Sequence, residues 1–232
     1  MSQFAFKQFI IGQNHAAMKV STDGILLGAW APLDGTGKII DVGSGTGLLA
    51  LMLKQRAPQS EVHAVELDND AIFDAKQNIA QSPWPDIQLH HCAIQKFDSH
   101  GNFDLMISNP PYFNDSLKAQ TPQRSRARHT DSLSFLELLQ AFKRLTNPNG
   151  HLAIILPLYE SEHICEVASK VGVFVIKRCE VKATPKKAVS RCLLYFSKVR
   201  GECESTDLTI YDQQNQYSDD YVALCREFYL KM

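Results

Sequence analysis

The sequence contains no apolar run long enough to cross a membrane. Its longest apolar stretches, Gly24–Leu33 and Leu152–Tyr159, are about half of the roughly 20 residues that a membrane-spanning helix needs. The opening residues, MSQFAFKQFIIGQNH, lack the apolar core and the small-residue cleavage site of a signal peptide. We therefore expect a cytoplasmic protein that does not enter a membrane.

Cysteine pairs with the spacing of a zinc knuckle or a redox motif are also absent. The six cysteines stand at positions 92, 165, 179, 192, 203 and 225, and no two of them form a C-x-x-C pair. Most lie in segments that resemble strand or helix, where a reduced cysteine packs as a small hydrophobic residue. This pattern predicts no metal site and favours a reducing compartment.

An excess of charge of one sign is missing as well. The 24 Lys and Arg residues and 25 Asp and Glu residues leave a net charge of −1, so the chain as a whole does not attract polyanions. The charges are nevertheless segregated, because residues 176–200 and 118–129 are strongly basic whereas residues 201–232 are acidic. One face could therefore bind a polyanion, although the same charges would also suit an ordinary solvated surface.

The length and the alternation of patterns predict one α/β domain spanning residues 1–232. Apolar runs typical of strands at 38–42, 61–66, 87–91, 103–108 and 151–157 alternate with helical patterns at 47–56, 70–81 and 133–145. This order predicts a doubly wound, mostly parallel sheet with helices on both faces. The last two predicted strands, 173–182 and 191–198, are separated by a connection too short for a crossover helix, so we expect that pair to be antiparallel.

A glycine-rich turn, Asp41-Val-Gly43-Ser-Gly45-Thr-Gly47, joins the first strand of this core to the next helix. Glycine permits positive φ and close approach of a ligand, and a helix N-terminus offers unpaired N–H donors. Glu66 ends the following strand, where a carboxylate can bind both hydroxyls of a ribose. The combination predicts a cofactor that contains a nucleoside, with its adenine near Cys92 and Ala93.

The order of the glycines distinguishes between cofactors. Dinucleotide folds use G-x-G-x-x-G, whereas this turn reads G-x-G-x-G and has an acid, Asp41, two residues before the first glycine. An acid there suits a cationic ligand better than a pyrophosphate. S-adenosylmethionine has a sulfonium and an ammonium and no phosphate, so we favour it over a nicotinamide cofactor or a purely structural glycine turn.

A second motif, Asn109-Pro110-Pro111-Tyr112, follows the strand predicted at 103–108. The side-chain carbonyl of Asn109 and the main-chain carbonyl of Pro110 are two acceptors that match the two protons of an exocyclic NH2 group, and Tyr112 can stack on a planar base or amide. Such a nitrogen is a poor nucleophile because its lone pair is conjugated, and accepting both protons favours a reactive, pyramidal nitrogen. It becomes acidic only as the methyl group arrives, so no strong general base is needed.

The turn DVGSGTG, Glu66 and the NPPY motif together resemble the class I S-adenosylmethionine-dependent methyltransferases, in the subgroup that methylates amino nitrogens. The similarity extends from about Lys38 to Lys198. It implies a Rossmann-like, seven-stranded sheet whose last strand is antiparallel. It also implies catalytic roles for Asn109, Pro110 and Tyr112, and a cofactor site made of Asp41, Gly43, Gly45, Gly47, Glu66, Leu67, Cys92, Ala93 and Asn109.

The NPPY motif does not by itself choose the substrate, because adenine-N6 methyltransferases of DNA and RNA share it with enzymes that methylate a glutamine amide of release factors. Residues 6–30 and Ala127-Arg128-His129 resemble the bacterial methyltransferases that act on adenine 37 in the anticodon loop of a valine tRNA. The resemblance implies tRNA as the partner. The resemblance implies that the enzymes that methylate glutamine have a separate helical amino-terminal domain. The roughly 35 residues that precede the core in this sequence are too few for such a domain. A non-catalytic RNA-binding module is disfavoured by the intact Asp41, Glu66 and NPPY.

The basic segments supply the candidate contacts to RNA. An adenine in an anticodon loop is already single-stranded, which spares the cost of about a few kcal/mol for flipping a base out of a duplex. Ser21-Thr22-Asp23 is expected to cap a helix over 24–30, and the family pattern adds a flap over the cofactor. We expect a monomer with a flap at 1–36, a catalytic core at 37–200 and an acidic segment with a final helix at 201–232. The predicted RNA contacts are Arg126, Arg128, His129, Lys186 and Lys187.

Overall fold

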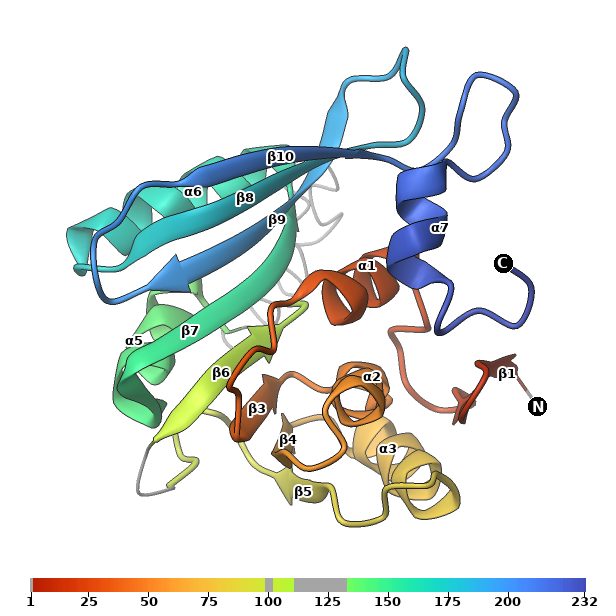
Figure 1. Cartoon of the computed structure of the whole chain (residues 1–232). Helices are drawn as coiled ribbons and strands as arrows, with labels where there is room; N and C mark the ends of the chain where they lie inside the picture. Colours follow the sequence, from red (N-terminus) through yellow and green to blue (C-terminus); the bar gives the residue numbers. More distant parts are fainter. Residues whose placement is uncertain (1, 99–101, 111–132) are drawn as a thin grey trace, which may run out of the picture.

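A twisted β-sheet runs through the centre of the computed structural model, which describes residues 2–98, 102–110 and 133–232 (Figure 1). The order of its strands is β10-β8-β9-β7-β6-β3-β4-β5. These strands are β3 (Lys38–Val42), β4 (Glu61–Glu66), β5 (Gln88–His91), β6 (Phe103–Ser108), β7 (Thr146–Pro157), β8 (Phe174–Lys182), β9 (Val189–Ser197) and β10 (Glu204–Thr209).

The directions of the strands confirm the predicted α/β sheet. Strands β5, β4, β3, β6 and β7 are parallel neighbours, and β9 is inserted antiparallel between β7 and β8. The antiparallel pair expected from the short 183–190 connection is therefore present. The predicted number of seven strands is wrong for the described residues, because β10, from the acidic segment, pairs parallel to β8 and makes an eighth strand.

Helices cover both faces of the sheet, as expected (Figure 1). Successive core residues of a strand face opposite sides, so Ile39 packs in one apolar cluster and Ile40 in the other. One cluster includes side chains of four helices: α1 (Thr22–Trp30), α2 (Leu48–Arg56), α3 (Asn69–Gln81) and α7 (Asp219–Cys225). The other lies under α5 (Phe135–Leu145) and α6 (Leu158–Lys170).

The helix boundaries agree closely with the local signals in the sequence. Ser21 is the N-cap of α1, and its hydroxyl accepts a hydrogen bond from the N–H of Gly24 at 3.3 Å, which confirms the predicted cap. Ser134 and Glu137 form a reciprocal capping box at the start of α5. No helix within the described ranges is long and apolar enough to cross a membrane.

The N-terminal and C-terminal segments lie on the same side of the molecule (Figure 1). A short hairpin, β1 (Gln3–Ala5) with β2 (Ile10–Gly12), precedes the core. The N–H of Lys7 donates to the carbonyl of Phe228 at 2.9 Å. Tyr221 and Cys225 of α7 are buried in the same apolar cluster as residues of α1, so the final helix packs on the fold.

Candidate active site

The glycine turn between β3 and α2 has the backbone conformation that its sequence predicted. Gly43, Gly45 and Gly47 have φ of 70°, 55° and 82°, in the left-handed region that side chains disfavour. A Cβ on Gly43 or Gly45 would meet no atom within 4 Å, so these glycines border open space rather than a crowded core. The turn is attached to the neighbouring strand β4, because the N–H of Gly43 donates to the carbonyl of Val65 at 2.9 Å.

Glu66, at the end of β4, is oriented by main-chain donors. Its Oε2 accepts the N–H of Gly45 at 2.8 Å, and its Oε1 accepts those of Leu67 at 2.7 Å and Asp68 at 2.9 Å. The half-buried carboxylate therefore lies against the glycine turn with a fixed orientation. Acceptor oxygens of this kind suit a pair of ribose hydroxyls.

Asp41 lies beneath the turn and is completely buried. Its Oδ2 accepts the N–H of Ala50 at 3.2 Å, whereas its Oδ1 has no hydrogen-bond partner in the described parts of the chain. Burial raises the pKa of Asp41 to about 8, the bond from Ala50 opposes this shift, and the charge of Glu66 adds to it. An unsatisfied buried carboxylate oxygen next to an open glycine turn fits a cationic ligand such as S-adenosylmethionine better than a phosphate.

One pocket brings the glycine turn and Asn109 together, as the two motifs predicted. Asn109 follows β6, and a Cβ added to Gly24 of α1 would lie 3.8 Å from its Nδ2. Pro110 follows directly and is buried. The pocket is lined by Met18, Lys19, Val20, Ser21, Gly24, Gly43, Ser44, Gly45, Thr46, Leu48, Leu49 and Asn109.

Of the predicted cofactor-site residues, Gly43, Gly45 and Asn109 line this pocket, whereas Asp41, Gly47, Glu66, Leu67, Cys92 and Ala93 are outside its lining. Cys92 and Ala93, which were predicted near the adenine, follow the end of β5, and Leu67 follows the end of β4. The N–H of Cys92 donates to the carbonyl of Glu66 at 3.0 Å, and Ala93 follows half-buried. Leu67 is 54% exposed. Burial raises the pKa of the Cys92 thiol, so this cysteine is suited to packing rather than to nucleophilic chemistry.

The predicted RNA contacts divide into two groups. Lys186 and Lys187 are exposed in the β8–β9 turn. Because β8 and β7 are both antiparallel to β9, this turn lies at the same edge of the sheet as the carboxyl ends of β3 and β6. The remaining predicted residues, Tyr112, Arg126, Arg128 and His129, lie outside the described residues.

Residues 18–21 form a wall of the pocket. Sequence reasoning predicted a flap over the cofactor within residues 1–36, but it named none of Met18, Lys19 and Val20 as cofactor-site residues. These three residues belong to no helix or strand, and Ser21 was noted as a helix cap and as part of the family's flap pattern. The available signal was Gly24, in the first turn of α1. A Cβ there would lie 3.0 Å from Cδ2 of Leu48, which is a tight contact, so a glycine suits the close approach of α1 to the helix after the glycine turn.

Comparison with known proteins agrees with this geometry. Residues 23–156 match the family described as methyltransferase small domain, and the chain belongs to that family. It is 53% identical over its full length to the full length of a protein of Pseudoalteromonas translucida named tRNA1(Val) (adenine(37)-N6)-methyltransferase. A protein of the same name from Bacteroides fragilis is 41% identical, also over the whole of both chains.

Solved structures confirm the fold. A predicted O-methyltransferase from Agrobacterium tumefaciens superposes with a TM-score of 0.69 and 16% identity, covering 89% of this chain and 96% of that one. The methyltransferase subunit of a type I restriction-modification system from Streptococcus thermophilus gives a TM-score of 0.61 at 20% identity, covering 91% of this chain and 52% of that one.

Proposed function

We propose that this chain transfers the methyl group of S-adenosylmethionine to the N6 nitrogen of adenine 37 in a valine tRNA. The full-length identity of 53% to a curated enzyme of that name carries the proposal. The pocket supports it, since the glycine turn and Asn109 line the same space. A methyl donor in the turn and a target amine at Asn109 would therefore be neighbours.

Different residues would have different roles in this reaction. Glu66 would hold the ribose hydroxyls of the cofactor, Asp41 would favour its positive charge, and the glycine turn would leave space for the bound cofactor. The bound cofactor supplies an electrophilic methyl group on a positively charged sulfur. Asn109 and the carbonyl of Pro110 would accept the two N–H bonds of the adenine amine and direct its lone pair towards that methyl group.

The proposal also includes the surroundings of the site. Residues 1–36 would form a flap over the cofactor, 37–200 the catalytic core and 201–232 a C-terminal segment of a single domain. Tyr112 would stack on the adenine, and Arg126, Arg128, His129, Lys186 and Lys187 would contact the RNA. The enzyme would act in the cytoplasm as a monomer and without a metal ion.

The decisive experiment uses purified protein, labelled S-adenosylmethionine and bulk tRNA from cells that lack the gene. We expect label in tRNA and N6-methyladenosine on nucleoside mass spectrometry. Asn109→Ala should lower kcat by about 100-fold or more, because it removes one of the two acceptors of the target amine. Asn149→Ala is the matched control, since Asn149 is exposed and lies at the start of β7, at the opposite edge of the sheet.

Other outcomes would point to other functions. Label in a release factor and none in RNA would replace the proposal with glutamine methylation, and label in rRNA or DNA alone would replace only the substrate. Unchanged tRNA modification by Asn109→Ala would overturn the catalytic role of the NPPY motif.

A further inference from the structure

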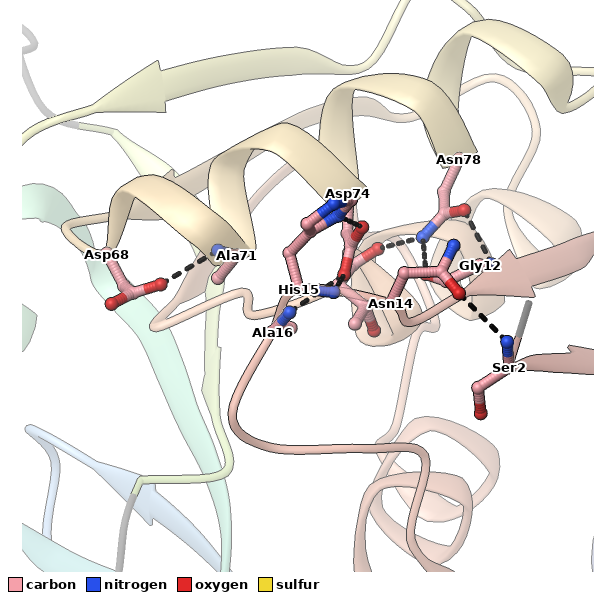
Figure 2. Close-up of polar contacts among 10 residues, drawn as sticks. Ser2, Gly12, Asn14, His15, Ala16, Asp68, Ala71, Asp74 and Asn78 are labelled. Atoms are coloured by element: carbon pink, nitrogen blue, oxygen red, sulfur yellow. Dashed lines mark hydrogen bonds and ion pairs between the residues drawn. The ribbon is translucent and has the colours of Figure 1, made fainter.

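Helix α3 carries two polar side chains that are buried. Asp74 is 2% exposed and Asn78 is 4% exposed. Asp74 contacts the segment that follows β2, and Asn78 contacts Gly12, the last residue of β2, as Figure 2 shows. Buried polar groups are retained where they satisfy other polar groups, so their partners indicate what they are for.

Asp74 binds the chain where it leaves the amino-terminal hairpin. Its Oδ2 accepts the main-chain N–H groups of His15 at 2.9 Å and Ala16 at 2.8 Å, and its Oδ1 lies 2.8 Å from Nδ1 of His15 (Figure 2). Burial alone would raise the pKa of Asp74, but the hydrogen bonds from Ala16 and His15 outweigh it and lower that pKa. The carboxylate thus holds two backbone amides that belong to no strand or helix.

Asn78 joins the end of β2 to the glycine turn. Its Oδ1 accepts the N–H of Gly12 at 2.7 Å, and its Nδ2 donates to the carbonyl of Gly12 at 2.9 Å and to that of Thr46 at 2.9 Å. Thr46 is one of the residues that line the pocket. One amide nitrogen therefore holds together two segments that are 34 residues apart in the sequence.

The chain beyond this attachment forms the wall of the pocket made by residues 18–21. The Oε1 of Gln13 accepts the N–H of Val20 at 2.7 Å, which closes the loop of residues 13–20 on itself. Met18, Lys19, Val20 and Ser21 then line the pocket together with residues of the glycine turn. The two segments that line the pocket are thus both attached to one helix, through Asn78 and Asp74.

We infer that Asp74 and Asn78 are positioning residues for the cofactor, which hold the wall of residues 18–21 at the distance from the glycine turn that S-adenosylmethionine requires. Neither side chain lines the pocket itself. The inference rests on the proposed function for the identity of the cofactor. If the wall is ordered before the ligand binds, no binding free energy is lost in ordering it. A variant that loosens the wall should therefore bind the ligand more weakly.

The sharpest test is Asn78→Asp, with Gln77→Glu as its control. The aspartate keeps an acceptor for the N–H of Gly12 but loses both donors, and it sets an oxygen against the carbonyls of Gly12 and Thr46. Gln77 is exposed on the same helix, so Gln77→Glu makes the same amide-to-acid change away from the wall. We expect calorimetry to show at least about tenfold weaker S-adenosylmethionine binding by Asn78→Asp and a change within about twofold for the control.

Kinetics and hydrogen exchange separate positioning from plain stability. Asn78→Asp should raise KM for the cofactor while kcat at saturating cofactor stays within about threefold of wild type. Amides of residues 13–21 should exchange faster in the variant, and cofactor should slow them again. A lower Tm with cofactor affinity unchanged below the transition would overturn the inference and leave a purely structural role.

A second pair of variants keeps the test decisive if Asn78→Asp does not fold. Asp74→Asn preserves size and one acceptor but weakens the bonds to residues 15 and 16, and the exposed Asp70 of the same helix gives the control Asp70→Asn. The inference is supported if Asp74→Asn binds the cofactor more weakly than wild type while Asp70→Asn does not. It is overturned if Asp74→Asn and Asp70→Asn bind the cofactor equally well. Wild-type protein that fails to bind S-adenosylmethionine would instead overturn the proposed function.

Discussion

Oε2 of Glu66 and the main-chain nitrogen of Gly45 are 2.8 Å apart, so the acid at the end of β4 is hydrogen-bonded to the turn that ends β3. This contact fixes the carboxylate beside the turn. Because Oε1 of Glu66 also accepts the N–H groups of Leu67 and Asp68, the side chain has little freedom to lose when a ligand binds.

Glu66→Gln should therefore weaken cofactor binding strongly. The amide would place an NH2 group against one or more of the main-chain N–H groups that now donate to Glu66, and it would accept ribose protons less well. We expect calorimetry to give a Kd for S-adenosylmethionine raised by about tenfold or more. Asp70→Asn, an exposed change of the same kind, should leave that Kd unchanged, and equal affinities for both variants would contradict the assignment.

Asp41 should make the ligand-free protein less stable as the pH rises. The folded pKa of about 8 lies above the usual unfolded value, so the folded state holds a proton that the unfolded state has lost between about pH 4 and pH 8. Stability from this group is complete below that window and falls by up to about 1.4 kcal/mol per pH unit across it.

Asp41→Asn removes the titration and so isolates it. We expect urea unfolding at several pH values to show that the unfolding free energy of the variant rises steadily relative to that of wild type from about pH 5 to about pH 8. If the free energies of unfolding of the two proteins changed with pH in parallel, the pKa of Asp41 would not be raised in the folded state.

The stacked pair of His63 and His90 should make the protein more stable as the pH rises, which is the opposite of the effect of Asp41. Nδ1 of His63 and Nε2 of His90 are 3.0 Å apart, and burial, together with the charge of His63, lowers the pKa of His90. The unfolded state then binds more protons, so stability is present above about pH 6.5 and is lost as the pH falls through that value. His90→Gln should lessen the loss of unfolding free energy between about pH 7.5 and pH 5.5, whereas the exposed His163→Gln should not.

The two lysines of the β8–β9 turn should contribute to RNA binding through charge alone. Lys186→Ala combined with Lys187→Ala should raise KM for tRNA and reduce the slope of log K against log salt by up to about 2, or about one per phosphate contact. Affinity for the cofactor should stay unchanged. A double change at the exposed Lys76 and Lys170 is the control, and an unaltered salt slope in the Lys186 and Lys187 variant would remove these residues from the interface.

The order of strands and helices could be predicted because most elements carry a local signal. The run KIIDV of β3 and the Ser134–Glu137 capping box are readable without neighbours. Strand β10 is not, because Glu204, Ser205, Thr206 and Asp207 are all exposed and show no apolar alternation. Its strand conformation comes from pairing with β8, which is a contact distant in sequence.

The same distinction applies to the candidate site. Asp41, Gly43, Glu66 and Asn109 stand at the ends of recognisable strands, so their meeting at one edge follows from the parallel sheet. Asn78 looks in sequence like the polar face of an amphipathic helix. Its role becomes visible only in the structure, where its side chain forms hydrogen bonds with Gly12 and Thr46, each more than 30 residues away in the sequence.

The polar character of β10 has a consequence for how copies of this protein behave when concentrated. Strand β10 forms one margin of the sheet, and β5, with Gln88 and His91 exposed, forms the other. An open strand edge is a template on which a second chain can add its own strand, and charged or strongly hydrated side chains discourage that addition. The β10 margin carries the exposed charges of Glu204 and Asp207, and β5 is only four residues long. Charge on an edge strand and a short edge strand both discourage edge-to-edge aggregation.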